Sequence, residues 1–297
     1  MDYLALSFEL RQLDPPVVEA YCLTLGALAI TLSDARDDAV LEPAPGEVRL
    51  WPGTRLQALF AGDVDRAAMV AHLAQQFGLA AGHIRTETLA DRAWEREWLR
   101  DFHALRFGRR LWVCPHHENV LDPSARVVKL DPGLAFGTGT HPSTALCLEW
   151  LDAHLNAGMT VIDYGSGSGI LGVAAAVLGA AHVAAYDIDP QALLATTENA
   201  LANQVAPQVS VHADPATLPP RVDVLLANIL AGTLCELGSD FAQRLVAGGQ
   251  IVLAGILAEQ AESVADVYAP WFEVSHRANR DGWVLLAGTR RTLFAHY

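Results

Sequence analysis

The sequence predicts an α/β protein in which a Rossmann-like domain follows a smaller α+β domain of ferredoxin-like fold. The first 90 residues read as β-α-β-β-α-β, the order of the ferredoxin-like fold. From about residue 109, apolar strand segments alternate with helical segments, as in a parallel sheet built from βαβ units. The chain then ends in two strand segments joined by a turn too short for a crossover, so an antiparallel C-terminal hairpin closes the parallel sheet.

The elements of the first domain follow from its hydrophobic periodicity. Alternating apolar and polar residues predict strands, and apolar residues at helical spacing predict helices. Proline or aspartate at the start of the helical segments is typical of helix starts. The expected strands cover residues 3–10, 27–33, 56–61 and 83–89, and the expected helices lie within residues 14–27 and 63–78.

A charged, tryptophan-rich segment at residues 91–108 is predicted to be an amphipathic helix that links the two domains. Trp94 and Trp98 are four residues apart and therefore share one helix face. Such a stripe is more typical of domain packing than of a binding platform. We therefore expect three parts: a ferredoxin-like domain over 1–90, a linker helix over 91–108 and the Rossmann-like domain over 109–297.

The second domain has five candidate parallel strands and the closing hairpin. Its helices are expected to begin near Ser168, Pro190, Ala231 and Ala258. The expected strands cover residues 160–165, 182–188, 209–214, 222–229 and 249–256, and the hairpin strands cover 271–279 and 282–290 around the turn Arg280-Asp281-Gly282.

Composition excludes several classes of protein. The formal charge of −14 comes without a lysine- or arginine-rich block, which argues against a surface that reads nucleic acid and favours a basic protein as partner. The four cysteines form no C-x-x-C pair, so neither a disulfide framework nor a zinc site is indicated. No apolar run is long enough to span a membrane, and the acidic N-terminus does not resemble a signal peptide. We expect a cytoplasmic protein.

A glycine-rich turn in the middle of the chain is the strongest local signal of a ligand site. A buried strand ends at Gly165-Ser-Gly167-Ser-Gly169 and a helix follows, so the backbone can approach a ligand closely and direct amide groups toward it. Asp187 follows the next strand about 20 residues later, where doubly wound nucleotide domains carry a ribose-binding carboxylate. Asp189, just before Pro190, is better placed to cap the next helix.

A dinucleotide dehydrogenase is the alternative, because Gly167-Ser-Gly169-Ile-Leu-Gly172 satisfies G-x-G-x-x-G. Asp163 argues against it. A carboxylate immediately before the glycines would repel a pyrophosphate, but it could receive the ammonium group of a methionine moiety. The closing antiparallel hairpin and the position of the glycine turn in mid-chain also favour S-adenosylmethionine over NAD(P).

Four segments of the second domain resemble the PrmA family, bacterial methyltransferases of ribosomal protein L11. They are LDPGLAFGTGTHPSTALCLEWL (130–151), VIDYGSGSGIL (161–171), YDIDPQAL (186–193) and ANILAGTL (227–234). The resemblance implies a class I, Rossmann-like fold and transfer of methyl groups from S-adenosylmethionine to lysine side chains and the α-amino group of ribosomal protein L11. It also implies that the N-terminal domain recognises the substrate.

The resemblance also implies cofactor contacts at four positions, namely Thr144, Gly165, Asp187 and Asn228. We expect Asp187 to accept hydrogen bonds from the ribose hydroxyls. Asn228 is the candidate catalytic residue, because its oxygen and the neighbouring Ile229 carbonyl could accept from the incoming amine and aim its lone pair at the methyl carbon. Related amino-methyltransferases carry Asn-Pro-Pro-aromatic here, whereas this chain has Asn-Ile-Leu-Ala.

The remaining expectations rest on the residues around the glycine turn. Asp163 and Gly167 are expected to contact the cofactor, Phe136 to form an apolar wall and His141 to make a polar contact. Either Ser143 or Thr144 is expected to cap the helix that follows. His116-His117-Glu118 reads as a solvated turn, because neighbouring strand residues point to opposite sides, so no metal ligands are assigned.

Two other functions stay open. One is a cofactor-binding module that recognises a ribosomal partner without catalysis. The other is a class I methyltransferase that acts on another protein or on a small-molecule amine, because the motifs of the catalytic domain identify the methyl donor more specifically than the methyl acceptor. A small-molecule enzyme has less use for a separate β-α-β-β-α-β domain, which favours a protein substrate.

Overall fold

A computed structural model of the chain describes residues 2–36, 51–89, 103–130 and 139–292. The chain divides into two compact units, residues 1–95 and 96–297, each described by itself. Phe136, Trp94 and Trp98, which the sequence analysis singled out, lie outside the described residues. Within the described residues, no helix combines the length and the apolar character needed to cross a membrane.

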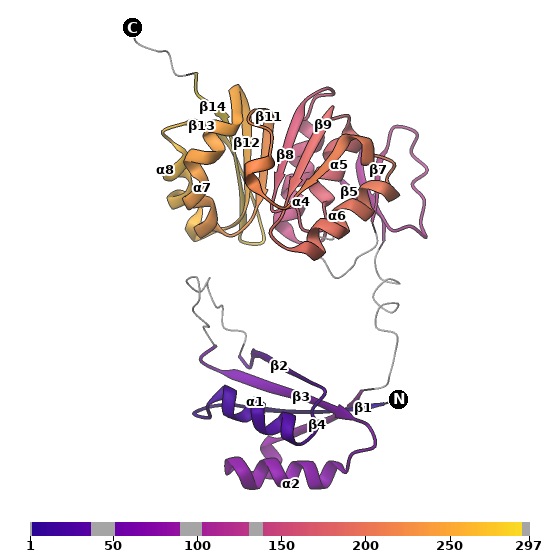
Figure 1. The fold of residues 1–297 in the computed structure, drawn as a ribbon, viewed down its shortest axis with the longest axis vertical. Helices are drawn as coiled ribbons and strands as arrows, with labels where there is room; N and C mark the ends of the chain where they lie inside the picture. Colours follow the sequence, from indigo (N-terminus) through magenta and orange to yellow (C-terminus); the bar gives the residue numbers. More distant parts are fainter. Residues whose placement is uncertain (1, 37–50, 90–102, 131–138, 293–297) are drawn as a thin grey trace. The chain divides into compact units, whose positions relative to one another are not determined.

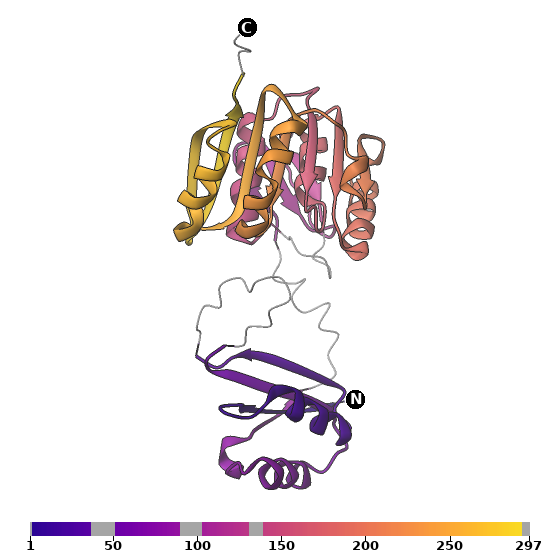
Figure 2. The ribbon, with the colours of Figure 1, turned by 60° about the vertical axis from the view of Figure 1, so that its left-hand side comes forward.

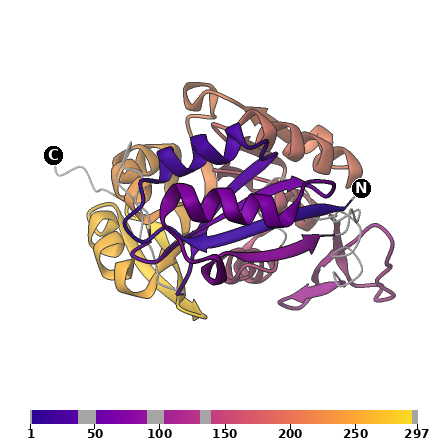
Figure 3. The ribbon, with the colours of Figure 1, turned by 90° about the horizontal axis from the view of Figure 1, so that it is seen from below.

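The first unit has the predicted β-α-β-β-α-β order and a sheet of four antiparallel strands in the order β2-β3-β1-β4. Both helices lie on the same face of this sheet (Figures 1 and 3). The elements are β1 (Tyr3–Glu9), α1 (Pro15–Thr24), β2 (Ala29–Asp34), β3 (Thr54–Ala61), α2 (Arg66–Phe77) and β4 (Arg85–Leu89), with a 3₁₀ turn at Ala81–His83.

Alternation along the central strands builds the core of this unit. Leu4, Leu6 and Phe8 of β1 are buried under the helices, whereas Ser7 between them is more exposed. Asp65 caps α2, as predicted, by accepting from the amides of Ala67 and Ala68. The ferredoxin-like prediction is therefore confirmed.

The predicted linker helix over residues 91–108 is wrong at its C-terminal end. Residues 105–107, expected to finish the linker helix, form strand β5 (Leu105–Phe107), which pairs antiparallel with β6 (Leu111–Cys114). The turn between them contains Gly108 at φ +72°, a conformation that a helix interior does not allow. The buried carboxylate of Asp152 accepts from the amides of Arg109 and Arg110 and so fixes this turn.

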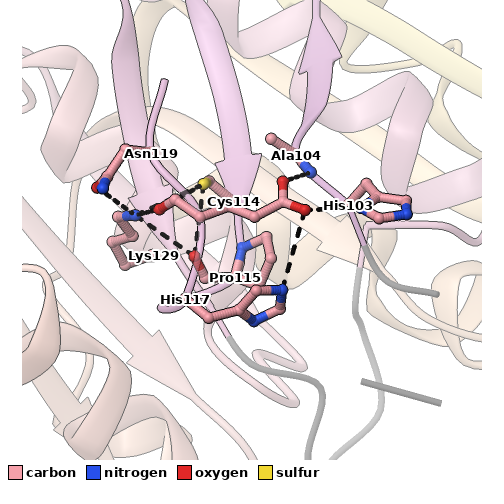
Figure 4. A network of polar contacts seen from close by, with 8 residues as sticks. His103, Ala104, Cys114, Pro115, His117, Asn119 and Lys129 are labelled. Carbon is pink, nitrogen blue, oxygen red and sulfur yellow. Dashed lines mark hydrogen bonds and ion pairs between the residues drawn. The ribbon is translucent and has the colours of Figure 1, made fainter. Parts of the chain in front are cut away.

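A polar network stabilises the small sheet that β5 and β6 form with β7 (Arg126–Lys129) (Figure 4). Glu118 accepts from the amide of Ala104 at 2.9 Å, and its carboxylate lies 2.6 Å from His103 Nδ1. The bond with His103, followed by the bond with Ala104, lowers the pKa of Glu118. The Lys129 ammonium donates to the carbonyls of Pro115 and Glu118. This network explains the predicted turn at His116-His117-Glu118 as a structural one.

The second unit is built on a seven-stranded sheet in the order β10-β9-β8-β11-β12-β14-β13. Strands β10, β9, β8, β11 and β12 are parallel to one another, whereas β14 and β13 are antiparallel to their neighbours. The strands are β8 (Thr160–Tyr164), β9 (His182–Tyr186), β10 (Val209–His212), β11 (Val222–Asn228), β12 (Leu245–Leu257), β13 (Phe272–Arg280) and β14 (Trp283–Arg290).

Helices cover both faces of this sheet (Figure 2). One core packs under α4 and α5 and the other under α7 and α8. The helices are α4 (Pro142–His154), α5 (Ile170–Leu178), α6 (Pro190–Ala202), α7 (Ala231–Arg244) and α8 (Ala261–Tyr268). The hairpin turn is Asp281-Gly282, both at positive φ, which suits the tight connection of β13 to β14. The predicted parallel sheet with its closing antiparallel hairpin is confirmed.

Candidate active site

Three adjacent strands bring the predicted site residues to one edge of the large sheet. In the order β9-β8-β11, the carboxyl ends carry Asp187, Gly165 and Asn228. Ligands of open α/β sheets bind at this edge, where the strand order reverses direction. The start of α4 adds Thr144 from a fourth element, so residues from four parts of the chain meet here.

At the glycine turn the backbone packs closely against a side chain just beyond the adjacent strand β11. Gly165 has φ +78°, and a Cβ placed there would overlap Cγ2 of Ile229, the residue after Asn228. The expectation that the turn directs free amides to the ligand is wrong for several positions. The amides of Gly165 and Ser166 donate to the Tyr186 carbonyl, and that of Gly167 donates to Asp187. At these positions the turn therefore provides a closely packed backbone and not free amide donors.

Asp187 is held in place by two backbone amides. Its Oδ2 accepts from Gly167 at 2.8 Å and its Oδ1 from Asp189 at 3.0 Å, and its side chain is half-buried. A carboxylate has about four lone-pair positions, so acceptor capacity remains on both oxygens. Asp189 caps α6 by accepting from Gln191, which confirms the capping role expected for this acid.

Asp163 lies beneath the glycine turn and is 1% exposed. Its Oδ2 accepts from the amide of Gly172 at 2.8 Å, while its Oδ1 has no hydrogen-bond partner among the described residues. Burial raises the pKa of Asp163 to about 7, the bond with Gly172 opposes that rise, and the charge of Asp187 adds to it. A buried carboxylate with one unpaired oxygen fits a nearby cation.

Asn228 contacts the first turn of α4. Its Nδ2 donates to Thr144 Oγ1 at 3.3 Å, between residues 84 positions apart in the chain. The predicted capping role is wrong, because His141 and not Ser143 or Thr144 is the N-cap: its ring accepts from the amide of Ser143. Pro142 takes the first helical position, so the cap lies two residues before Ser143 and the Thr144 hydroxyl is left to contact Asn228.

The environment of His141 includes an aromatic residue that the sequence analysis missed. The rings of His141 and Trp283 lie 4.6 Å apart between centroids, with an interplanar angle of 69°. Burial lowers the pKa of His141, which keeps the imidazole neutral near pH 7. The only sequence signal for Trp283 is its position directly after the hairpin turn, because such a residue lies at the end of the sheet where β12 finishes.

These residues fit S-adenosylmethionine. The unpaired buried oxygen of Asp163 suits a cationic group, and Asp187 offers charged acceptors for hydroxyl groups. The mixed sheet, its closing hairpin and a site at the carboxyl ends of the strands define a class I methyltransferase of Rossmann-like fold, an enzyme dependent on S-adenosylmethionine.

Comparison with known proteins identifies the family. The family model "Ribosomal protein L11 methyltransferase (PrmA)" matches residues 2–291, so the chain belongs to the PrmA family. The ribosomal protein L11 methyltransferase of Methylococcus capsulatus is 53% identical over 271 residues, which cover 90% of this chain and 92% of the relative. That of Alkalilimnicola ehrlichii is 48% identical, covering 98% of this chain and all of the relative.

A solved structure is similar to part of the chain. The crystal structure of a ribosomal protein L11 methylase from Lactobacillus delbrueckii subsp. bulgaricus aligns with a TM-score of 0.60 at 30% identity. The alignment covers 64% of this chain and all of the other.

Proposed function

We propose that this enzyme transfers methyl groups from S-adenosylmethionine to lysine side chains and the α-amino group of ribosomal protein L11, in the cytoplasm. Similarity to L11 methyltransferases along nearly the whole chain supports the substrate. The observation that carries the chemistry is the contact between Asn228 and Thr144, because it orients an acceptor oxygen at the carboxyl edge of the sheet. The chain's net charge of −14 favours a basic partner.

The cofactor-binding roles are assigned to residues at this edge. Asp187 accepts from the ribose hydroxyls, Gly165 and Gly167 let the cofactor approach the backbone, and Asp163 offers the unpaired oxygen of its buried carboxyl group to the cationic end of the cofactor. Thr144 lies above them at the start of α4, and Phe136, outside the described residues, is proposed as an apolar wall. When bound, S-adenosylmethionine supplies a methyl group activated by the positively charged sulfur.

Asn228 aligns the acceptor amine. Because its Nδ2 donates to Thr144, its Oδ1 is left as an acceptor. Together with the Ile229 carbonyl, Oδ1 accepts hydrogen bonds from the amine N–H groups and leaves the nitrogen lone pair directed at the methyl carbon. Alignment of this kind lowers the barrier without a change in the chemistry of either reactant.

The amine must be neutral when it attacks. At pH 7 a lysine with an ordinary pKa near 10.4 loses its proton at a cost of about 4.6 kcal/mol, whereas an α-amine with a pKa near 7.8 requires about 1 kcal/mol. Burial of the amine beside a cationic cofactor lowers its pKa, since both effects disfavour the charged form. The proton leaves to water before attack, so no general base is assigned.

Mass spectrometry tests this proposal. Unmodified ribosomal protein L11 is incubated with the enzyme and S-adenosylmethionine carrying a CD₃ group. We expect added mass in steps of one labelled methyl group, mapped to lysines and to the N-terminal amine. Absence of transfer to L11 with intact binding of S-adenosylhomocysteine would contradict the proposal. Transfer to other amines would then indicate a different acceptor, and no transfer to any amine would indicate a binding module.

A further inference from the structure

The segment after Asn228 does not provide an aromatic wall for the acceptor. Leu230 is 58% exposed, and Ala231 is buried at the start of α7. An amine that approaches Asn228 therefore needs an apolar surface from another element, which excludes water and holds the alkyl stem of the acceptor residue. The first turn of α4 is where such an element meets Asn228.

Trp283 reaches that turn from the closing hairpin. It begins β14 opposite Leu257, the last residue of β12, and so lies at the carboxyl edge of the sheet. Its indole contacts the ring of His141, the N-cap of α4. Thr144, one turn further along the same helix, contacts Asn228. Trp283 and Asn228 therefore contact the same helical turn from two different strands.

An ion pair connects the hairpin to α4. Arg280, the register partner of Trp283, donates to both carboxylate oxygens of Glu149 at 2.9 and 3.0 Å. A cavity of about 400 Å³ borders this contact, lined among others by Pro142, Ala145, Glu149 and Arg280. Its lining also includes Thr140, the residue before His141, so the cavity lies next to the helix start that Trp283 contacts.

We propose that Trp283 is a substrate-positioning residue. Its indole face, with the His141 ring beside it, forms the wall along which the alkyl stem of the acceptor residue lies while the amine reaches Asn228. An indole face also attracts an ammonium group, so the ring favours the charged lysine on arrival and the methylated product ammonium. This inference rests on the proposed function, because it requires an amine acceptor.

Three substitutions separate this role from simple packing. Trp283→Phe keeps a ring, Trp283→Leu keeps apolar volume without a ring face, and Trp283→Ala removes both. Trp271→Leu is the matched control, since Trp271 precedes the same hairpin and packs near Gly238 on α7, away from α4. Steady-state methylation of L11 and calorimetric binding of S-adenosylhomocysteine are measured for each variant, with thermal melts to verify the fold.

We expect the KM for L11 to rise about tenfold in Trp283→Leu and Trp283→Ala. The kcat should change less than threefold, and the Kd for S-adenosylhomocysteine less than twofold. Trp283→Phe and Trp271→Leu should stay within about twofold of the parent. An unchanged KM in a folded Trp283→Leu, or an equal rise in Trp271→Leu, would overturn this inference but not the proposed function. A parent enzyme that does not methylate L11 would overturn the proposed function first, and this inference with it.

Discussion

The side-chain amide of Asn228 donates a hydrogen bond to the hydroxyl of Thr144, 3.3 Å away and 84 residues distant in the chain. This contact joins the end of β11 to the first turn of α4 and orients the proposed catalytic amide. Thr144 is 1% exposed, so its hydroxyl has no access to bulk water as an alternative partner. Loss of the Asn228 amide leaves the buried Thr144 hydroxyl without this partner, and loss of the hydroxyl removes the contact that orients the half-buried Asn228 side chain.

We therefore expect Thr144→Val to lower kcat about tenfold at saturating cofactor, because a net hydrogen bond of about 1.4 kcal/mol corresponds to that factor. Thr144→Ser retains the hydroxyl and should stay within about twofold of the parent. Steady-state methylation of L11 measures both. Equal kcat values for the valine variant and the parent would mean that Asn228 does not depend on this contact.

Asp187→Ala should weaken cofactor binding more than it slows turnover. A hydrogen bond to a charged acceptor contributes about 1.5–3 kcal/mol, so the Kd for S-adenosylhomocysteine should rise about 10- to 150-fold. The variant also leaves the Gly167 and Asp189 amides without their acceptor. Calorimetry measures the change, and an unchanged Kd would remove Asp187 from the cofactor site.

Two glycines with similar backbone conformations provide a controlled test of the glycine turn. Gly165 and Gly158 have φ of +78° and +88°. A Cβ would overlap Ile229 at Gly165, but would meet nothing within 4 Å at Gly158. Both alanine variants should lose about 1 kcal/mol of stability from the positive φ. Only Gly165→Ala should also displace Ile229, the neighbour of Asn228, and thereby weaken cofactor binding by about tenfold or more. Equal Kd values in the two variants would show that the packing of Gly165 against Ile229 does not support the cofactor site.

The pKa of Asp163 predicts a pH-dependent stability. The folded protein retains a proton on this group up to about pH 7, whereas the unfolded chain releases it near pH 3.8. The unfolded state thus binds fewer protons between these values, and stability falls as the pH rises through them. Asp163→Asn should remove this slope. The free energy of unfolding of the variant should therefore rise, relative to that of the ligand-free parent, by up to about 1.4 kcal/mol per pH unit from pH 4 to 7. Parallel stability curves in denaturant titrations would contradict the prediction.

Local patterns predicted most of the fold. The glycine turn, the acid after β9 and the proline at the start of α6 are each encoded within a few residues, and the structure has all three where the periodicity indicated. The end of the linker helix was wrong because strand pairing between Leu105–Phe107 and Leu111–Cys114 overrides the helical spacing of that segment.

Contacts distant in sequence could not be predicted. The pairing of Asn228 with Thr144 depends on how α4 packs across β11, and the contact of Trp283 with His141 depends on where the hairpin closes the sheet. Asp163 was expected to meet the ligand from the strand end, but its burial and its bond to Gly172 follow only from the assembled turn. These are tertiary properties that a strand-by-strand interpretation does not contain.

The turnover of Asn228→Ala with ribosomal protein L11, measured at saturating S-adenosylmethionine beside the Kd for S-adenosylhomocysteine, tests the central claim most directly. If Asn228 aligns the amine for transfer, kcat should fall about 100-fold or more while the Kd changes less than threefold. A kcat equal to that of the parent would contradict the assignment of Asn228 as the residue that aligns the acceptor.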